Sequence, residues 1–197
     1  MSKRVLVIGA ARSGLAAVDF LCNHGYSVIL TDMSPEADEA VLAHLRQLKV
    51  QMIWGEQPDV SALRPDFIVI SPGIALTIPP AVAAKEMGIP IINETELAFC
   101  SARASFVAIT GTNGKTTTTS LLGELLKNEQ HQVVVGGNIG LPLVSIAESL
   151  GEEDLIVAEM SSFQLETTVT FKPKVALMLN LTPDHLDRHG DMQGYLE

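Results

Sequence analysis

Short runs of aliphatic and β-branched residues alternate along this chain with longer stretches in which apolar residues recur every three or four positions. The short runs are typical of buried strands, and the longer stretches are typical of amphipathic helices. Strands that alternate with helices form βαβ units, in which neighbouring strands lie parallel. The pattern therefore predicts an α/β fold built on mainly parallel sheets.

The first series of elements occupies residues 1–93. Its predicted strands cover residues 4–9, 27–32, 50–54, 66–71 and 89–93. Helices are predicted between them at residues 13–24, 35–48 and 79–87, with possible capping side chains at Ser13, Ser34 and Thr77. These elements make a Rossmann-like N-terminal domain, and the charged segment 94–104 is predicted to be a short helix and a linker.

A second series occupies residues 105–197. Its predicted strands cover residues 106–110, 132–137, 154–159 and 174–180, and its predicted helices cover residues 115–128 and 142–150. The chain ends at Glu197 within what reads as the start of another helix. We therefore expect residues 105–197 to be an incomplete second domain.

Composition and charge restrict what the chain can bind. With 47% hydrophobic residues over 197 positions, the chain can bury packed cores. The 23 acidic residues against 13 basic ones give a net charge of −10, which disfavours a general nucleic-acid surface. No apolar stretch approaches the roughly 20 residues that span a bilayer, and Arg12 interrupts the N-terminal run that imitates a signal peptide. We expect a cytoplasmic monomer that neither enters a membrane nor binds nucleic acid.

A first glycine-rich turn, GAARSG at residues 9–14, lies between a predicted strand and a predicted helix. With Asp32 at the end of the next strand, this placement fits a Rossmann nucleotide fingerprint, but Ala11 replaces the glycine that lets a backbone approach a pyrophosphate. A dinucleotide is therefore disfavoured. A nucleotide or sugar-nucleotide at the same sheet edge, which Ser71 to Gly73 would also line, and a plain turn without ligand both stay open.

A second turn, TGTNGKTTT at residues 110–118, gives a sharper signal because it has the features of a phosphate-binding loop. Gly111 and Gly114 permit the positive φ angles of such a loop, Lys115 would reach the terminal phosphates, and the Thr116 hydroxyl would face Mg²⁺. Ile109 stands where the general motif has its first glycine, which weakens generic kinase or GTPase readings. The residues predicted to hold nucleotide are Gly111, Thr112, Asn113, Gly114, Lys115, Thr116 and Thr117.

Two further residues at predicted strand ends could complete an ATP and metal site. Glu159 closes the strand 154–159, where such ATPases commonly place a metal-directed acid, and His185 follows the strand 174–180. Taken alone, Glu159 is as well explained as a capping acid and His185 as a loop histidine. Together with the phosphate loop they predict a metal site. The spacing of Asp184, Asp187 and His189 identifies no further ligand.

The segments TGTNGKT, GGNIG (136–140), EMSSFQLE (159–166) and NLTPDHLDRHG (180–190), in this order and spacing, resemble the Mur ligases of bacterial cell-wall synthesis. The resemblance covers the whole chain and implies a UDP-binding N-terminal domain, a central P-loop ATPase domain and a C-terminal domain. This chain resembles the first domain, at 1–93, and part of the second, at 105–197. Within the family, SSFQLE and the turns GAARSG and SPGI resemble the branch that adds D-glutamate to UDP-N-acetylmuramoyl-L-alanine.

The resemblance also implies a chemistry and roles for particular residues. ATP, with Mg²⁺, would phosphorylate the carboxylate of UDP-N-acetylmuramoyl-L-alanine, and the amine of D-glutamate would attack the acyl phosphate to form an amide. Lys115 and His185 would be catalytic, and the metal-binding residues would be Thr116, Glu159 and His185. The residues that match substrate contacts of the family are Arg12, Ser13, Asp32, Gly73, Asn138, Ser161 and Gln164.

Two parts of the family's machinery have no counterpart in these 197 residues: the carbamylated lysine that supports the second metal and the C-terminal domain. We therefore expect this chain to have little or no ligase activity, while its first domain still binds a UDP-sugar. Three alternatives stay open. They are another Mur-type or folylpolyglutamate-type ligase, which shares the TGTxGK loop, a nucleotide-binding module without chemistry, and a Rossmann dehydrogenase with an unrelated second domain.

Overall fold

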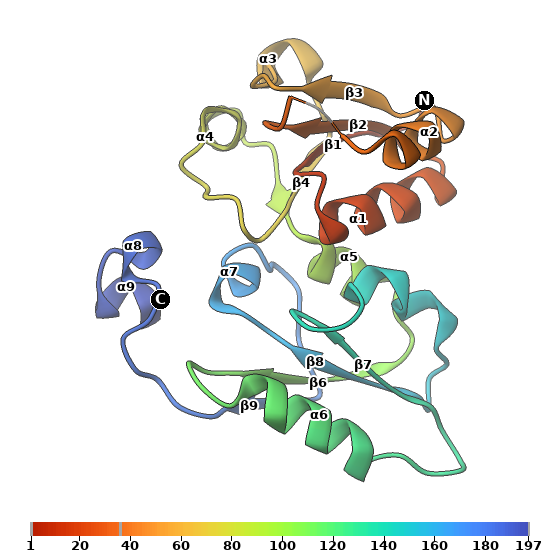
Figure 1. Ribbon diagram of the computed structural model, residues 1–197, viewed down its shortest axis with the longest axis vertical. Coiled ribbons are helices and arrows are strands. Elements are labelled where there is room, and N and C mark those ends of the chain that lie inside the picture. Colours follow the sequence, from red (N-terminus) through yellow and green to blue (C-terminus); the bar gives the residue numbers. More distant parts are fainter. Residues whose placement is uncertain (1, 36, 197) are drawn as a thin grey trace. The chain divides into compact units, whose positions relative to one another are not determined.

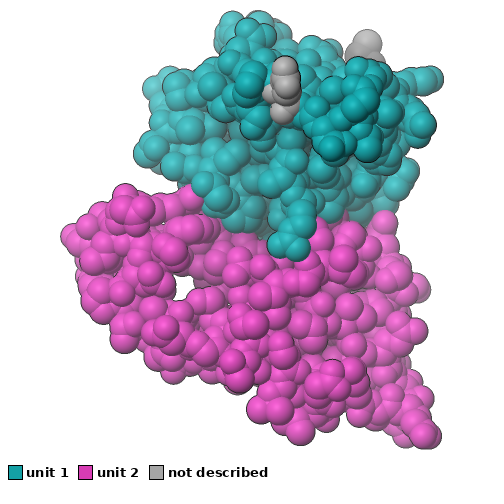
Figure 2. Space-filling view, in the orientation of Figure 1, with its two compact units in different colours: residues 1–97 teal, residues 98–197 magenta. Residues whose placement is uncertain are grey.

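The computed structural model describes residues 2–35 and 37–196 (Figure 1). The chain divides into two compact units, Met1–Leu97 and Ala98–Glu197, which Figure 2 colours teal and magenta. Each unit has its own parallel sheet with helices packed on it. The predicted α/β fold is confirmed. No helix of the described ranges is both long and apolar enough to cross a membrane.

Unit 1 contains a five-stranded sheet in the order β3-β2-β1-β4-β5. Its strands are β1 (Arg4–Ile8), β2 (Ser27–Asp32), β3 (Gln51–Trp54), β4 (Phe67–Ile70) and β5 (Ile91–Ile92), and all pairs are parallel. Its helices are α1 (Arg12–Asn23), α2 (Glu39–Gln47), α3 (Val60–Leu63) and α4 (Pro79–Glu86), while α5 (Glu94–Ser101) begins in unit 1 and ends in unit 2. This is the strand order of a Rossmann sheet, whose ligand crevice lies where the order reverses, between β1 and β4.

The core of unit 1 follows from the alternation of side chains along each strand. One face of the sheet packs against α3 and α4 through Leu6, Ile8, Ile29, Val60, Ile68, Ile70, Ala81 and Ala84, all at most 5% exposed. Helix α1 contacts β1, β2 and β4, and its Ala17, Val18 and Leu21 are fully buried. With both faces covered, the strands read as continuous apolar runs, which explains why the sequence predicts them well.

The three predicted caps in unit 1 are wrong. Ala11 and Ile78 are the N-cap residues of α1 and α4, and neither provides a side-chain cap. Helix α2 begins at Glu39, later than predicted, because Asp38 caps it by accepting a 2.8 Å hydrogen bond from the Ala40 N–H. A carboxylate is as good a cap as a serine hydroxyl, and the sequence prediction considered only Ser34.

Unit 2 contains a four-stranded parallel sheet in the order β7-β8-β6-β9 (Figure 1). Its strands are β6 (Ser105–Thr110), β7 (Val133–Gly137), β8 (Leu155–Glu159) and β9 (Val175–Met178). Its helices are α6 (Lys115–Leu125), α7 (Ser162–Leu165), α8 (Leu186–His189) and α9 (Met192–Leu196), with 3₁₀ turns η1 (Leu143–Ser145) and η2 (Ala147–Ser149). Val107, Ile109 and Val157 form a core with Leu122 and Leu126 on one face of this sheet.

The helix predicted at residues 142–150 is wrong, because this segment forms the two 3₁₀ turns. The Ser145 N–H bonds to the Pro142 carbonyl and the Ser149 N–H to the Ile146 carbonyl, both at the i to i+3 spacing. The hydroxyls of Ser145 and Ser149 donate to the same two carbonyls at 2.7 Å. Serine side chains thus bond carbonyls that an α-helix would use for its own ladder, although the apolar residues Ile146 and Ala147 between them are buried.

Candidate functional site

The carboxyl ends of the four strands of unit 2 meet at one edge of its sheet. Glu159, at the end of β8, stands in register with Ile109 of β6 on one side and with Gly137 of β7 on the other. Strand β6 leads into the glycine-lysine loop, and β9, on the far side of β6, leads toward His185. The topology therefore brings the loop, Glu159 and the segment before His185 to a single sheet edge, where α/β proteins bind ligands.

The loop between β6 and α6 has the backbone of a phosphate cradle. Gly111 has φ +135° and Gly114 has φ +85°, so both need the conformational freedom of glycine. Gly114 is the N-cap of the 11-residue helix α6 and provides no side-chain cap. The N–H groups of the first turn of α6 are therefore left for an anion, which the helix dipole also favours.

Lys115 lies folded back over this loop. Its Nζ donates to the Gly111 carbonyl at 2.6 Å and to the Thr112 carbonyl at 3.0 Å. The ammonium group is half-buried, at the place where a phosphate in the loop would need a positive charge. Thr116 and Thr117, the next two residues, are exposed.

Glu159 is a buried carboxylate of which only one oxygen has a partner. The residue is 1% exposed, and its Oε1 accepts a 2.7 Å hydrogen bond from Asn138 Nδ2. Its Oε2 is buried and bonds to nothing in the described ranges. The Asn138 backbone N–H also donates to the Glu159 carbonyl at 2.9 Å, which fixes the two residues together. Asn138, predicted as a substrate contact, thus orients the acid.

The free oxygen of Glu159 suits Mg²⁺. A buried, ionised carboxylate oxygen costs several kcal/mol unless a positive group pairs with it, and oxygen ligands are those that Mg²⁺ prefers. Within residues 2–35 and 37–196 no cluster of three His, Cys, Asp or Glu side chains could hold a metal unaided. Glu159 fits Mg²⁺ that is shared with water and phosphate oxygens, which is its usual coordination next to ATP, and the metal role of Thr116 stays a prediction.

His185 lies in a strained backbone conformation. Its φ is 50°, which is rare for a residue with a side chain, and it forms the N-cap of α8. The side chain is 52% exposed, with Nε2 at 3.6 Å from Asp184 Oδ2, and its ring lies 4.8 Å from the Phe163 ring. His185 does not form a three-residue ligand cluster with Glu159 in the part of the chain that the structure describes, so its metal role stays a prediction.

Ser161 and Gln164 form a reciprocal capping box at the start of α7. Gln164 Oε1 accepts from the Ser161 N–H at 2.9 Å, and Ser161 Oγ accepts from the Gln164 N–H at 3.3 Å. Gln164 is 3% exposed, whereas Ser161 is partly exposed. The pair therefore shapes the turn after β8, and its contact with substrate stays a prediction.

In unit 1, the turn between β1 and α1 carries an internal anion. Asp32 accepts hydrogen bonds from the N–H groups of Ala10, at 2.7 Å, and Ser34, at 2.8 Å. Burial tends to raise the pKa of Asp32, but these donors, together with the Ser34 side chain, outweigh it and hold the pKa below its usual value. The Ala10 N–H is thus already used by a carboxylate, which supports the prediction against a dinucleotide at this turn.

Three other predicted residues surround the same turn. Arg12 is exposed at the start of α1, Ser13 is half-buried beside it, and Gly73 is exposed in the turn after β4. Ser71 Oγ donates to the Gly9 carbonyl at 3.3 Å, so the turns after β1 and β4 touch at the point where the strand order reverses. Gly73, however, has open space where a side chain would start.

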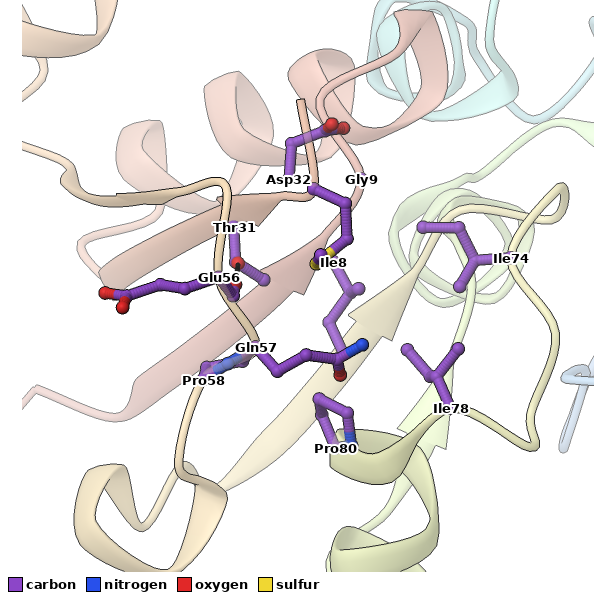
Figure 3. A pocket seen from close by; sticks show the side chains of 11 residues that line it. Ile8, Gly9, Thr31, Asp32, Glu56, Gln57, Pro58, Ile74, Ile78 and Pro80 are labelled. Atoms are coloured by element: carbon purple, nitrogen blue, oxygen red, sulfur yellow. Dashed lines mark hydrogen bonds between the residues drawn. The ribbon is translucent and has the colours of Figure 1, made fainter. Parts of the chain in front are cut away.

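A cavity of about 240 Å³ opens at this edge of unit 1 (Figure 3). Its walls are mainly apolar, with Ile74 and Ile78 on one side and Thr31 and Glu56 on the other (Figure 3). Asp32 and Gly9 lie at its rim. The cavity is large enough for one flat ring and lies beside the turn between β1 and α1.

The sequence did not single out Asn180 or Thr182, which lie beside the phosphate loop. Asn180 Oδ1 accepts from the Asn113 N–H at 2.9 Å, and the Thr112 hydroxyl donates to the Thr182 carbonyl at 3.0 Å. The available signal was their position, immediately after the strand that neighbours β6.

Comparison with known proteins matches each half of the chain to a model of one family. The Mur ligase MurD-like N-terminal domain matches residues 3–93, and the Mur ligase middle domain matches residues 109–197. The first match contains the sheet of unit 1, and the second contains the phosphate loop, Glu159 and His185.

Curated relatives of the chain carry a common name. The UDP-N-acetylmuramoylalanine--D-glutamate ligase of Pelotomaculum thermopropionicum is 52% identical over 194 residues, which cover 98% of this chain and 43% of that protein. The protein of the same name from Caldicellulosiruptor bescii is 47% identical over 196 residues, with 98% and 43% covered. The chain thus spans less than half the length of these relatives.

Solved structures of peptide ligases share the fold. The UDP-N-acetylmuramate:L-alanyl-gamma-D-glutamyl-meso-diaminopimelate ligase from Neisseria meningitides has a TM-score of 0.54 at 21% identity, over 99% of this chain and 65% of that one. A murein peptide ligase from Psychrobacter arcticus gives 0.51 at 19% identity, over 99% and 46%. Since both sequence models agree with the resemblance and with the two sheets, the chain belongs to the Mur ligase family.

Proposed function

We propose that this chain provides the UDP-sugar-binding and ATP-binding parts of a ligase that joins D-glutamate to UDP-N-acetylmuramoyl-L-alanine in peptidoglycan precursor synthesis. The named relatives support this reaction, and the family implies ATP-dependent ligation. The observation that carries the proposal is Glu159, a buried acid with one free oxygen, in register with the strand that leads into the phosphate loop. A binding module without chemistry would not need to keep such an acid.

In unit 2, the loop of residues 111–117 and Lys115 would hold the ATP phosphates. Glu159 and Thr116 would hold the Mg²⁺, with His185 as a ligand of a second ion near the substrate carboxylate. When bound, the metal neutralises charge on the phosphoryl group that is transferred. Asn138 keeps one oxygen of Glu159 occupied, so the other oxygen, Oε2, would be the one left to hold the cation.

The reaction proceeds in two steps with defined bonds. A carboxylate oxygen of the substrate attacks the γ-phosphorus of ATP, the bond to the β–γ bridging oxygen breaks, and ADP leaves. The amine of D-glutamate would then attack the acyl carbon, phosphate would depart with the electrons of the carbon–oxygen bond, and the nitrogen would release a proton to water as the amide forms. Lys115 would stabilise the negative charge that develops on the β-phosphate, since its ammonium group already lies over the loop.

In unit 1, the edge between β1 and β4 would hold the uridine diphosphate end of the substrate. Arg12 and Ser13 stand at the start of the 12-residue helix α1, which has no capping side chain and no acid in its first turn, and so suits a diphosphate. Gly73 leaves room on the opposite side. The cavity of Figure 3 would take the flat base, and Asp32 would shape the turn.

Ser161 and Gln164, with Asn138, stand near the strand ends of unit 2 and would serve the muramoyl-alanine end. The MurD-like N-terminal match over residues 3–93 favours this reading over a folylpolyglutamate-type ligase.

Calorimetry of the parent chain and two variants tests the proposal. The parent should bind ATP more tightly with Mg²⁺ than without it, and UDP-N-acetylmuramoyl-L-alanine should bind independently of both. In Glu159→Gln, the increase in ATP affinity that Mg²⁺ causes should be about tenfold smaller than in the parent, because one charged contact contributes about that much. Glu152→Gln, a matched change of an exposed acid ahead of β8, should leave it intact. A full Mg²⁺ effect in Glu159→Gln would exclude the metal site.

A further inference from the structure

Two loops at the edge of the unit 2 sheet are tied together by hydrogen bonds. Asn180 accepts from the Thr112 N–H at 3.1 Å through its carbonyl, and its side chain exchanges two 2.9 Å bonds with the backbone of Asn113. The Thr112 hydroxyl donates to the Thr182 carbonyl and accepts from the Thr182 N–H, both at 3.0 Å. The phosphate loop consists of residues 111–117, and we call residues 180–185 the histidine segment.

These bonds change the role of Thr112, which sequence had predicted to contact nucleotide. Its only hydroxyl proton is directed at Thr182, and its backbone N–H at Asn180. The Asn113 N–H is also used, by Asn180 Oδ1. A phosphate in this loop is thus left with the N–H groups from Gly114 onward and with Lys115. The first half of the loop therefore serves the histidine segment.

The histidine segment needs such support because His185 is strained. A non-glycine residue at φ 50° persists only where its surroundings fix it. Helix α8, which follows the segment, has its own anchor, since Arg188 donates to both oxygens of Glu166, at 3.1 and 2.7 Å, and stacks 4.3 Å from the Phe163 ring centre. Thr112 and Asn180 supply the near anchor.

We propose that Thr112 and Asn180 are positioning residues that hold the histidine segment against the phosphate loop, so that nucleotide bound in the loop stabilises the backbone around His185. The second half of this statement rests on the proposed function, because it needs ATP in the loop. The first half concerns the free chain alone. Among the residues that the structure describes, the hydrogen bonds of Thr112 and Asn180 stay within these two loops, apart from a 3.3 Å approach of the Thr112 hydroxyl to the Tyr195 hydroxyl.

Hydrogen–deuterium exchange of the free chain tests the clamp. Thr112→Val keeps the shape of the side chain and removes the hydroxyl, so amide exchange should rise about fivefold in peptides that cover 111–118 and 179–186. Thr112→Ser restores the hydroxyl and should return both to parental rates. Thr168→Val is the matched control, since its hydroxyl also donates to a backbone carbonyl, that of Leu165 at 3.0 Å, away from both loops.

Asn180→Ala provides a second route to the same result, because it removes the bonds to Asn113 without touching Thr112. It should also raise exchange in both peptides, while melting temperatures confirm that each variant is folded. Unchanged exchange at 179–186 in folded Thr112→Val and Asn180→Ala would overturn the clamp.

Addition of ATP and Mg²⁺ tests the coupling. In the parent, exchange should fall in both peptides, whereas in Thr112→Val it should fall at 111–118 alone. Equal protection of 179–186 in the two proteins would overturn the coupling. If 111–118 gains no protection in the parent, nucleotide does not enter the loop and the proposed function fails, while the free-chain comparison still decides whether the clamp exists.

Discussion

Each unit has a glycine-rich turn after a strand of its sheet, β1 in unit 1 and β6 in unit 2. The two turns differ in the charge of the side chains that contact them. In unit 1, the turn after β1 receives a carboxylate of its own chain, since Asp32 accepts the Ala10 N–H. In unit 2, the turn after β6 is held by the neutral side chain of Asn180 and is covered by the ammonium of Lys115. Neither α1 nor α6 has a capping side chain or an acid in its first turn.

The difference shows how one supersecondary motif can be set for different ligands. A turn that already holds a negative charge has less room for another, so it suits a ligand whose diphosphate rests mainly on the helix end. A turn with an added positive charge suits a triphosphate, whose transferred group gains charge in the reaction. The two turns also require glycine for different reasons, close packing at Gly14 and a positive φ at Gly114. Substitution of Gly14 gives the test with the largest expected effect.

Gly14→Ala should destabilise unit 1 strongly. A Cβ at Gly14 would lie 1.8 Å from the Gly9 carbonyl oxygen, and this oxygen belongs to the backbone and cannot rotate away. We expect a loss of about 3–5 kcal/mol in the free energy of unfolding, the range of severe core changes. Denaturant titration followed by circular dichroism would measure it. Gly73→Ala, where a Cβ meets open space, is the control. A loss below about 1 kcal/mol for Gly14→Ala would show that α1 can shift.

The inner strands β1, β4, β6 and β8 were predictable from sequence because burial on both faces gives them continuous apolar runs, whereas β9 is apolar but largely exposed. Their ends differ by one or two residues, as for Gly9, predicted in β1 but placed in the turn. The single-turn helices α7 and α8 were missed because four residues show no periodicity, and α7 owes its form to the capping box of Ser161 and Gln164.

The candidate site was predictable where a residue type suited to phosphate or metal binding stands at or just after the end of a predicted strand, as for Lys115 and Glu159. It was not predictable where a role depends on a partner distant in sequence. Asn180 lies 67 residues from Asn113, and its side-chain amide pairs with both the N–H and the carbonyl of that residue, as the backbone of a neighbouring strand would. The same limit explains Asp32, for which sequence suggested a ligand contact and the structure shows a bond to the turn itself.

Lys115→Met should weaken the binding of ATP and leave the binding of the UDP-sugar unchanged. It removes the positive charge over the phosphate loop and keeps the length of the side chain, so ATP affinity should fall about 10- to 100-fold, the value of one or two charge-assisted hydrogen bonds. Calorimetry should show unchanged binding of UDP-N-acetylmuramoyl-L-alanine. Lys127→Met, at the exposed end of this helix region, is the control. Equal loss of both ligands would mean that the two turns do not serve separate ligands.

Gly114→Ala should have a moderate effect, which contrasts with Gly14→Ala. At Gly114 the nearest atom to a new Cβ is Leu179 Cδ1 at 3.6 Å, so there is space, but φ is +85°. The cost is then backbone strain of about 1–2 kcal/mol in the free energy of unfolding. Chemical denaturation would measure it. A loss as large as that of Gly14→Ala would show that close packing, and not φ, requires the glycine.

Asp32→Asn should have the smallest effect, and it should depend on pH. The pKa of Asp32 is held below its ordinary value of 3.8, so its hydrogen bonds to Ala10 and Ser34 stabilise the fold fully above about pH 4. Because the carboxyl is only partly buried, we expect only about 0.5–1 kcal/mol in the free energy of unfolding at pH 7. As pH falls below 4 and through the lowered pKa, the parent loses this contribution and its advantage over the variant shrinks.

Urea titrations of both proteins at pH 7, 5, 4 and 3 measure the gap in the free energy of unfolding between the parent and Asp32→Asn, with the exposed Asp187→Asn as control. A gap that widens at low pH would contradict the internal anion, and with it the contrast between the two turns.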